Sequence, residues 1–435
     1  MSKTVIKGAV IVTLDDSRPD NFKGDIAVNG TIIEAITEYP QKIESGLFEK
    51  VIDGSSYIVM PGLVNTHGHA AMTLLRSYAD DMPLKEWLEE KIWPIEELMQ
   101  AEDVYWGTKL AIAEMIKSGT TTFTDMYMYM DRVAEAADES GIRAVLSRGL
   151  IGIDGGLEGL TESEEFIKNW QGAANGRITV TLGPHAPYTC PPEFLKKVIS
   201  LAEKTGSSLQ IHLSETRGEV DNCLEEHGKT PPELLNDLGL FNINTLAAHC
   251  VHLSDSDIDI LAENGVNVAH NPGSNLKLGS GIAPVARMLD KGINVGIGTD
   301  GASSNNNLDM IEEMRLTALL SKGVEMNPTL ISAKTALKMS TITGAKALGI
   351  AKTGILKEGY KADLIALRTD RPHLVPMHDP IANIVYSSAG ADVDLVMVDG
   401  DILLENRNLT KMDEQVILKK AAECTNRLIR YGKDN

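Results

Sequence analysis

The feature that most constrains the fold is an eightfold alternation of strand-like and helical segments through the middle of the chain. Short apolar runs alternate with longer segments whose apolar residues recur every three or four positions. The strand-like runs are 57–65, 120–126, 143–151, 178–185, 208–215, 245–251, 265–270 and 294–300. The helical segments are 84–99, 102–117, 129–139, 162–174, 192–204, 218–237, 255–263, 283–291, 308–321 and 329–348. This pattern predicts an α/β fold, a (β/α)8 TIM barrel, whose reacting residues lie at the carboxyl ends of the strands.

The two ends of the chain predict a second, smaller unit. Alternating β-branched segments fill residues 3–58, and "ADLIALRT" and "VDLVMVDGDILLE" repeat this texture near the C-terminus, before a helical tail from Asp413. A chain of 435 residues also exceeds the size of most single cores. We therefore expect a composite β-sandwich domain from residues 1–58 and 357–435, and a metal-dependent catalytic barrel from residues 59–356.

Charge and cysteine content exclude several classes of function. The 41 basic and 61 acidic residues give a net charge of −20, which repels nucleic acid and anionic membranes. The four cysteines form no CxxC pair and indicate reduced thiols. There is no signal-peptide pattern and no apolar run of about 18 residues. We expect a cytoplasmic protein without a nucleic-acid or membrane partner.

Histidines gather where the barrel strands are expected to end. In "PGLVNTHGHA", residues 61–70, His67 and His69 point to the same side of an extended chain. Such a pair alone is usually solvated. Five of the ten histidines, however, lie at or just beyond strand ends: His67, His69, His185, His212 and His249.

An aspartate completes this cluster. The last barrel strand ends in "GIGTD", which places Asp300 at the same rim. His67, His69, His212 and Asp300 would supply four ligands to a divalent ion such as zinc, with room for a water. Taken alone, Asp300 is equally well explained as the N-cap of the helix that follows. The convergence of these positions favours the metal site.

Several of these motifs resemble those of a known family. "PGLVNTHGHA", "QIHLSE", "LAAHC" and "GTDGASSNNNLDM" resemble the amidohydrolase superfamily, most closely its 5'-methylthioadenosine/S-adenosylhomocysteine deaminases. The resemblance spans nearly the whole chain. It implies a hydrolase that converts the adenine ring of 5'-methylthioadenosine, S-adenosylhomocysteine, 5'-deoxyadenosine or adenosine to the hypoxanthine form and releases ammonia.

The metal count and the catalytic roles follow from this chemistry. Relatives with two ions bridge them with a modified lysine on strand 4, and "ITVTLGPHAP" has no lysine, so we expect one Zn²⁺, with Fe²⁺ as an alternative. A bound cation lowers the pKa of water from 15.7 toward about 7, and Asp300 can accept the released proton. Glu215, in "HLSE", is placed to donate to N1 of the purine. An alternative interpretation of Glu215 is a surface residue at a helix start. The resemblance assigns His249 to polarising the water.

The resemblance also suggests residues that bind the substrate. It assigns Glu96 to the ribose hydroxyls and Trp87 to an apolar or stacking wall, with His185 and Arg148 also lining the pocket beside Glu215 and Asp300. Trp87 could equally pack in a core. Arg148 could form a structural ion pair or reach a neighbouring subunit of a homo-oligomer. Because residues 149–165 contain no other cation, a neutral 5' substituent should suit this pocket.

Two other classes of function are compatible with parts of this sequence. A guanine deaminase, or an amino- or chlorohydrolase of triazine or pyrimidine rings, would use the same metal chemistry, but a ribose-binding Glu96 favours a purine nucleoside. A non-catalytic scaffold would have lost ligands that this chain keeps. The loop Asn305–Asn307 is expected to turn over the site, and its role stays open.

Overall fold

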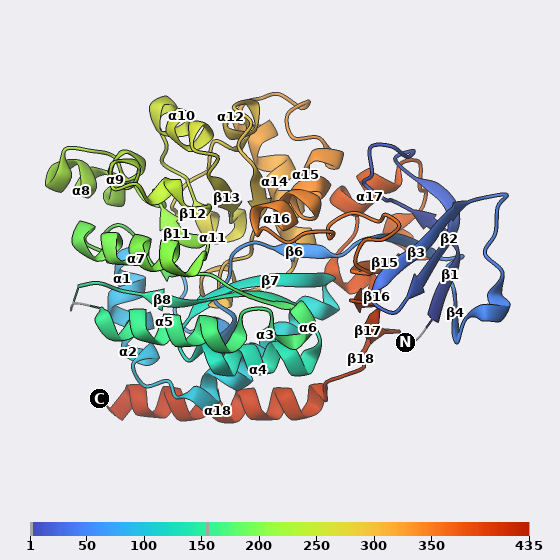
Figure 1. Cartoon of the computed structure of the whole chain (residues 1–435), viewed down its shortest axis with the longest axis horizontal. Coiled ribbons are helices and arrows are strands. Elements are labelled where there is room, and N and C mark those ends of the chain that lie inside the picture. The colour runs from blue at the N-terminus through green and yellow to red at the C-terminus, as the bar shows by residue number, and fades with distance from the viewer. Residues whose placement is uncertain (1–2, 154–155, 435) are drawn as a thin grey trace.

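The computed structural model describes residues 3–153 and 156–434. Helices surround parallel strands in one part of the molecule, and a sheet built from both ends of the chain forms the other part (Figure 1). Among the described residues, no helix combines the length and the hydrophobicity that a membrane crossing requires. The four cysteines are free and buried.

The predicted strand–helix alternation produces two parallel sheets. The five-stranded sheet contains β6 (Leu63–Asn65), β7 (Thr120–Tyr127), β8 (Arg143–Leu150), β9 (Ile178–Val180) and β10 (Gly183–Pro184). The four-stranded sheet contains β11 (Leu209–Leu213), β12 (Thr245–His249), β13 (Asn267–His270) and β14 (Val295–Ile297). Each strand pairs in parallel with its neighbours. Their side chains are almost all buried, as expected for parallel sheets covered by helices.

The two parallel sheets meet at both margins. At one margin the His212 N–H donates to the His185 carbonyl at 2.9 Å. At the other, the Thr66 N–H donates to the Ile297 carbonyl and the Asp300 N–H donates to the His67 carbonyl, both at 3.0 Å. These hydrogen bonds bring the carboxyl ends of strands from both sheets to one rim.

The run 57–65 is not the single strand that its sequence suggests. β5 (Tyr57–Pro61) pairs with strands near the two ends of the chain, whereas β6 belongs to a parallel sheet. Gly62 separates them, and a Cβ at this position would lie 2.1 Å from Thr121 Oγ1. The single-strand prediction was wrong because a continuous apolar run does not reveal which sheet each residue joins.

The ends of the chain contribute to one nine-stranded sheet. β5 lies between the N-terminal strand β1 and the C-terminal strand β15, and β4 pairs with β1 off the main path. Side chains from both ends share a buried cluster that includes Ile6, Ile26, Val59 and Leu364. Besides β5, the strands are β1 (Lys3–Ile11), β2 (Phe22–Asn29), β3 (Ile32–Glu38), β4 (Lys50–Asp53), β15 (Leu364–Arg368), β16 (Val393–Val398), β17 (Asp401–Glu405) and β18 (Asn408–Leu409).

The helices follow the predicted order, with several interruptions. The first expected helix is α1 (Leu84–Trp87), a π-helical turn (Leu88–Ile92) and α2 (Trp93–Glu96). Two prolines start a new helix within 218–237, giving α8 (Arg217–His227) and α9 (Pro231–Asp237). The others are α3 (Ala101–Lys117), α4 (Met130–Ser140), α5 (Leu157–Trp170), α6 (Ala173–Gly176), α7 (Pro192–Thr205), α10 (Asp255–Glu263), α11 (Pro272–Lys277), α12 (Val285–Asp290), α13 (Ala302–Asn305), α14 (Met310–Val324), α15 (Ala333–Met339), α16 (Ile342–Ala347), α17 (Pro380–Tyr386) and α18 (Glu414–Asp434).

The C-terminal helix lies against the helices around the parallel strands, along α3 (Figure 1). Lys117 of α3 forms an ion pair with Glu414 at 2.7 Å, and Arg427 forms one with Asp103. The helical tail predicted from Asp413 is therefore present, and it packs beside α3.

A buried arginine connects the two parts of the molecule. Arg143, which begins β8, donates from Nε to Asp363 at 2.9 Å and from Nη2 to Asp399 at 2.8 Å. All three side chains are less than 9% exposed. Because these side chains are buried, each charge is stabilised by the opposite charge beside it rather than by hydration.

Candidate active site

The two histidines after β6 both face Asp300. The Nε2 atoms of His67 and His69 lie 3.5 and 3.3 Å from Asp300 Oδ1. Their rings are nearly perpendicular, with centroids 4.9 Å apart. The structure therefore brings together the first and last strand ends, as the sequence predicts.

Backbone carbonyls determine which ring nitrogen of two histidines is free. His69 Nδ1 donates to the Met126 carbonyl and His212 Nδ1 donates to the His185 carbonyl, each at 2.7 Å. Because a carbonyl only accepts, each Nδ1 carries a proton, which leaves Nε2 as the ring nitrogen that can bind a metal ion once it is unprotonated. These two Nε2 atoms lie only 3.3 Å apart.

The donor atoms of this cluster fit a divalent metal ion. His67 Nε2 is buried and has no hydrogen-bond partner among the described residues, although buried polar atoms normally have one. Two overlapping groups of residues could each hold an ion, because the ligand atoms within each group all lie within 4.8 Å of one another. One group is His67, His212 and His249, and the other is His67, His69 and Asp300. Imidazole nitrogens with one carboxylate are the set that zinc and similar ions prefer. All four predicted ligands are present in this cluster, and His249 joins them.

Asp300 is held by short hydrogen bonds. Ser274 Oγ and Ser304 Oγ donate to its Oδ2 at 2.6 and 3.0 Å, and the Gly301 N–H donates to its Oδ1 at 2.8 Å. Gly301, not Asp300, is the N-cap of α13. Asp300 also has a φ of +63°, a left-handed conformation that non-glycine residues rarely adopt. Strain of this kind concentrates at functional sites.

Burial keeps most of the imidazoles neutral. It lowers the pKa of His67 to about 4 and that of His185 to about 3. Burial also opposes charge on His69, but the hydrogen bond to Asp300 raises the pKa of His69 to about 9. A metal ion beside Nε2 would take the place of that proton, because metal binding displaces protons from its ligands.

Glu215 and His249 form the adjoining part of the site. His249 Nδ1 donates to Asn275 Oδ1 at 2.8 Å, and its Nε2 lies 3.8 Å from Glu215 Oε2 and 4.0 Å from Asp300 Oδ2. Glu215 is only 5% exposed, so it is not the surface residue of the alternative interpretation. Burial raises the pKa of its carboxyl, which favours the protonated form.

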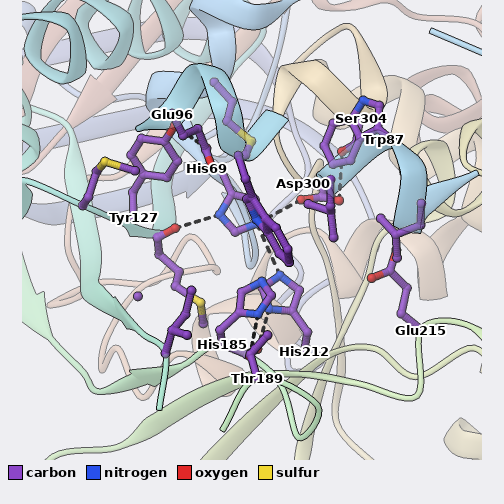
Figure 2. A pocket seen from close by; sticks show the side chains of 18 of the residues that line it. His69, Trp87, Glu96, Tyr127, His185, Thr189, His212, Glu215, Asp300 and Ser304 are labelled. Carbon is purple, nitrogen blue, oxygen red and sulfur yellow. Dashed lines mark hydrogen bonds and ion pairs between the residues drawn. The ribbon is translucent and has the colours of Figure 1, made fainter. Parts of the chain in front are cut away.

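A cavity of about 610 Å³ is bordered by His69, His212, Glu215, His249 and Asp300. Figure 2 shows Glu96 and Tyr127 on the opposite side of the histidines from Glu215. Tyr127 Oη donates to Glu96 Oε1 at 2.5 Å, and burial raises the pKa of Glu96 to about 7. Tyr127 was not predicted, although its position at the end of β7 could have suggested it.

The three remaining predicted residues also line the cavity, in different ways. Trp87 is 4% exposed and its indole N–H donates to the Ala79 carbonyl at 3.0 Å, so it packs in the core as well. Arg148 donates from Nε to Glu162 at 2.8 Å, the ion pair that was the alternative interpretation. His185 Nδ1 forms a hydrogen bond with Thr189 Oγ1 at 2.9 Å.

The sequence interpretation missed the residues that hold the candidate ligands. Ser274 and Asn275 follow β13 in "NPGSN", and Ser304 follows β14 in "GASSN". Their place after strand ends was the only available signal. In the loop Asn305–Asn307, the Asn305 side chain donates to the Thr299 carbonyl and to Glu313 Oε1, both at 2.8 Å. This asparagine thus anchors the turn beside Asp300.

The sequence has close relatives of known family. The sequence model of the amidohydrolase family matches residues 58–403. A Pelotomaculum thermopropionicum protein named 5-methylthioadenosine/S-adenosylhomocysteine deaminase is 50% identical over 430 residues, which cover 99% of each chain. A protein of the same name from Dictyoglomus turgidum is 53% identical over 412 residues, covering 94% of this chain and 97% of its own.

A solved structure matches over the same extent. It is an adenosine deaminase from Xanthomonas campestris with bound zinc, and it superposes with a TM-score of 0.93. Its sequence is 32% identical, and the match covers 99% of each chain. The chain therefore belongs to the amidohydrolase family and groups with the relatives named 5-methylthioadenosine/S-adenosylhomocysteine deaminase.

Proposed function

We propose that this protein is a metal-dependent hydrolytic deaminase of adenosines that carry a modified 5' position. The observation that carries the proposal is the convergence of His67, His69, His212 and Asp300 at one side of a cavity that also holds a buried Glu215. The names of the relatives support the same chemistry.

We propose that His67, His69, His212 and Asp300 hold one zinc ion, with Fe²⁺ as the alternative. When bound, a divalent cation lowers the pKa of water so that a nucleophile is available near neutral pH. The unpartnered His67 Nε2 and the fixed tautomers of His69 and His212 support this ligand set.

Two carboxyl groups would move the protons. Asp300 accepts one proton as the water oxygen bonds to C6, and protonated Glu215 donates to N1, where negative charge would otherwise develop. Asp300 then passes its proton to the amino group, so that the C6–N bond breaks and ammonia leaves. The second water proton replaces the one that Glu215 gave up.

His249 would orient these groups. Its Nδ1 is fixed by Asn275, so its Nε2 faces both Glu215 and Asp300. From this position it can hold the attacking water against C6. Hydrogen bonds from Ser274 and Ser304 keep Asp300 aimed at the same place.

The rest of the cavity would bind the nucleoside. Glu96, held by Tyr127, accepts hydrogen bonds from the ribose hydroxyls, and Trp87 and His185 bound the purine. The Arg148 guanidinium already pairs with Glu162, which leaves less of its charge for a substrate carboxylate. We therefore propose that a neutral 5' group, as in 5'-methylthioadenosine or 5'-deoxyadenosine, is preferred to the zwitterionic arm of S-adenosylhomocysteine.

We also propose that the two parallel sheets form one closed (β/α)8 barrel over residues 59–356. The hydrogen bonds at both sheet margins support closure. Residues 1–58 and 357–435 would then form the composite β-sandwich domain, with α18 packed back on the barrel. A cytoplasmic location and a homo-oligomeric state stay predictions.

The test is a substrate panel with coupled detection of ammonia, run on zinc-loaded enzyme. The panel contains 5'-methylthioadenosine, S-adenosylhomocysteine, adenosine, guanine and an aminotriazine. We expect the highest kcat/KM for 5'-methylthioadenosine and little turnover of the free bases. Turnover of guanine or the triazine, without turnover of any adenosine, would refute it.

A further inference from the structure

A second cavity adjoins the first. It has a volume of about 430 Å³ and lies between the α1 region and α8. Residues from α1, the π-helical turn, α2 and the loops after β8 and β10 line both cavities: Leu84, Leu88, Trp93, Ile153, Tyr188 and Thr189. The second cavity is therefore a side chamber of the candidate active site.

The purine and the ribose are anchored outside this chamber. Glu215, placed at N1, and Glu96, placed at the ribose hydroxyls, line the first cavity only. A bound nucleoside therefore fills the first cavity, and the chamber is open to whatever the nucleoside carries beyond its ribose.

The lining that the two cavities share is largely apolar. Leu88 and Tyr188 stand at the junction, and the chamber is also lined by Leu234 and Cys223, which are 8% and 7% exposed. Thr216, Asn222 and His227 add polar groups on the α8 side. An apolar lining that carries placed polar groups is typical of sites that bind small molecules. Each methylene group that such walls remove from water strengthens binding by about fourfold.

Charged side chains of the chamber also select against ligands that carry a negative charge. Lys85, Glu89 and Glu226 line the chamber and are exposed to solvent, and the buried Glu219 lines it as well. The carboxylates outnumber the ammonium group, so a ligand that carries its own carboxylate into the chamber meets net repulsion. An uncharged ligand does not.

We propose that this chamber is a subsite for long, uncharged, mainly apolar 5'-thioether arms, so that 5'-alkylthioadenosines larger than the methylthio compound are substrates. The inference rests on the proposed function and extends it to a class of substrate. It assigns specificity for the arm to residues of α8 that touch neither the purine nor the ribose.

The test compares 5'-methylthioadenosine with 5'-hexylthioadenosine and with an analogue whose arm ends in a carboxylate. Two substitutions on α8 should fill the chamber, Asn222→Trp and Gly218→Phe. Both residues line the chamber, and a Cβ on Gly218 would meet only Thr216 Oγ1, at 4.0 Å. Asp221→Trp is the matched control, because Asp221 is exposed on the same helix but does not line the chamber.

The wild-type enzyme should have a kcat/KM for the hexylthio compound at least equal to that for the methylthio compound, and a lower one for the carboxylate. Asn222→Trp and Gly218→Phe should each raise KM for the hexylthio compound by tenfold or more, with methylthio turnover unchanged within about twofold. Asp221→Trp should change neither.

The outcomes separate this inference from the proposed function. If the methylthio compound is deaminated but the hexylthio compound is not, the subsite is refuted and the function stands. Equal losses for both substrates in both α8 variants would also refute the subsite. If neither adenosine is deaminated by zinc-loaded wild-type enzyme, the proposed function itself fails.

Discussion

Replacing Glu215 by Gln tests whether this carboxyl group donates a proton to the purine. The two side chains have nearly the same size, and Glu215 is 5% exposed, so the packing should be retained. The Ser280 hydroxyl, which donates to Glu215 Oε1 at 3.4 Å, can donate to the amide oxygen instead. What the variant loses is the acidic proton.

The expected loss is large and confined to turnover. General acid–base groups contribute typically 10²–10⁴-fold, and the loss of one donor to developing negative charge costs about 10²–10³ in kcat, or about 2.7–4 kcal/mol. We therefore expect kcat to fall by about 10²–10⁴. Metal content should stay near that of the wild type, because Glu215 is in neither group of converging ligand atoms.

The assay is steady-state ammonia release from 5'-methylthioadenosine, with zinc measured in the same preparations by atomic emission. Glu225→Gln is the control, because Glu225 is exposed on α8 and lines neither cavity, and it should change kcat by less than twofold. A fall in kcat below tenfold, or the loss of zinc from Glu215→Gln, would refute the role assigned to this residue.

Three further predictions concern the candidate metal ligand Asp300, the buried ion pairs of Arg143 and the pH dependence of stability. Asp300→Asn should abolish turnover and lower zinc content, because an amide neither accepts the water proton nor carries charge; full zinc content with normal turnover would contradict this. Arg143→Ala should lower the free energy of unfolding in urea by about 3–5 kcal/mol, because Asp363 and Asp399 stay buried without their shared partner. Arg368→Ala, which breaks a more exposed pair with Asp370, should lower it by less than about 1 kcal/mol. Equal losses in the two variants would contradict this prediction. Burial lowers the pKa of His270 to about 3, so the unfolded chain binds a proton before the folded chain does as the pH falls. The free energy of unfolding should therefore decline from about pH 6.5 toward pH 3, by up to roughly 1.4 kcal/mol per pH unit. Urea midpoints of His270→Asn should decline less steeply with falling pH than those of the wild type, and an unchanged slope would refute the assignment.

The order of elements was predictable because each strand and helix has a strong local pattern. The runs that became β11, β12 and β14 are short and mainly apolar, and His212, His249 and Asp300 lie at or just beyond their ends. Parallel strands bring their carboxyl ends to one edge, so the positions of His69, His212 and Asp300 followed from chain order alone.

Features that depend on tertiary packing were not predictable. The break at Gly62 arises because β5 and β6 join different sheets, and a one-dimensional pattern carries no information about partners. An ion pair of Arg148 was an open alternative, but its partner Glu162 was not predictable, because it depends on how α5 packs beside β8. Tyr127, Ser274 and Asn275 act through other side chains, and such supporting residues have no characteristic spacing.

The central claim is that His67, His69, His212 and Asp300 together bind one catalytic cation. Anomalous diffraction at the zinc edge, from crystals of zinc-replete protein, tests it most directly. The account predicts a single strong peak about 2.0–2.2 Å from the three Nε2 atoms and from a carboxylate oxygen of Asp300. The absence of a peak between these side chains, or a peak bound by other residues, would contradict it.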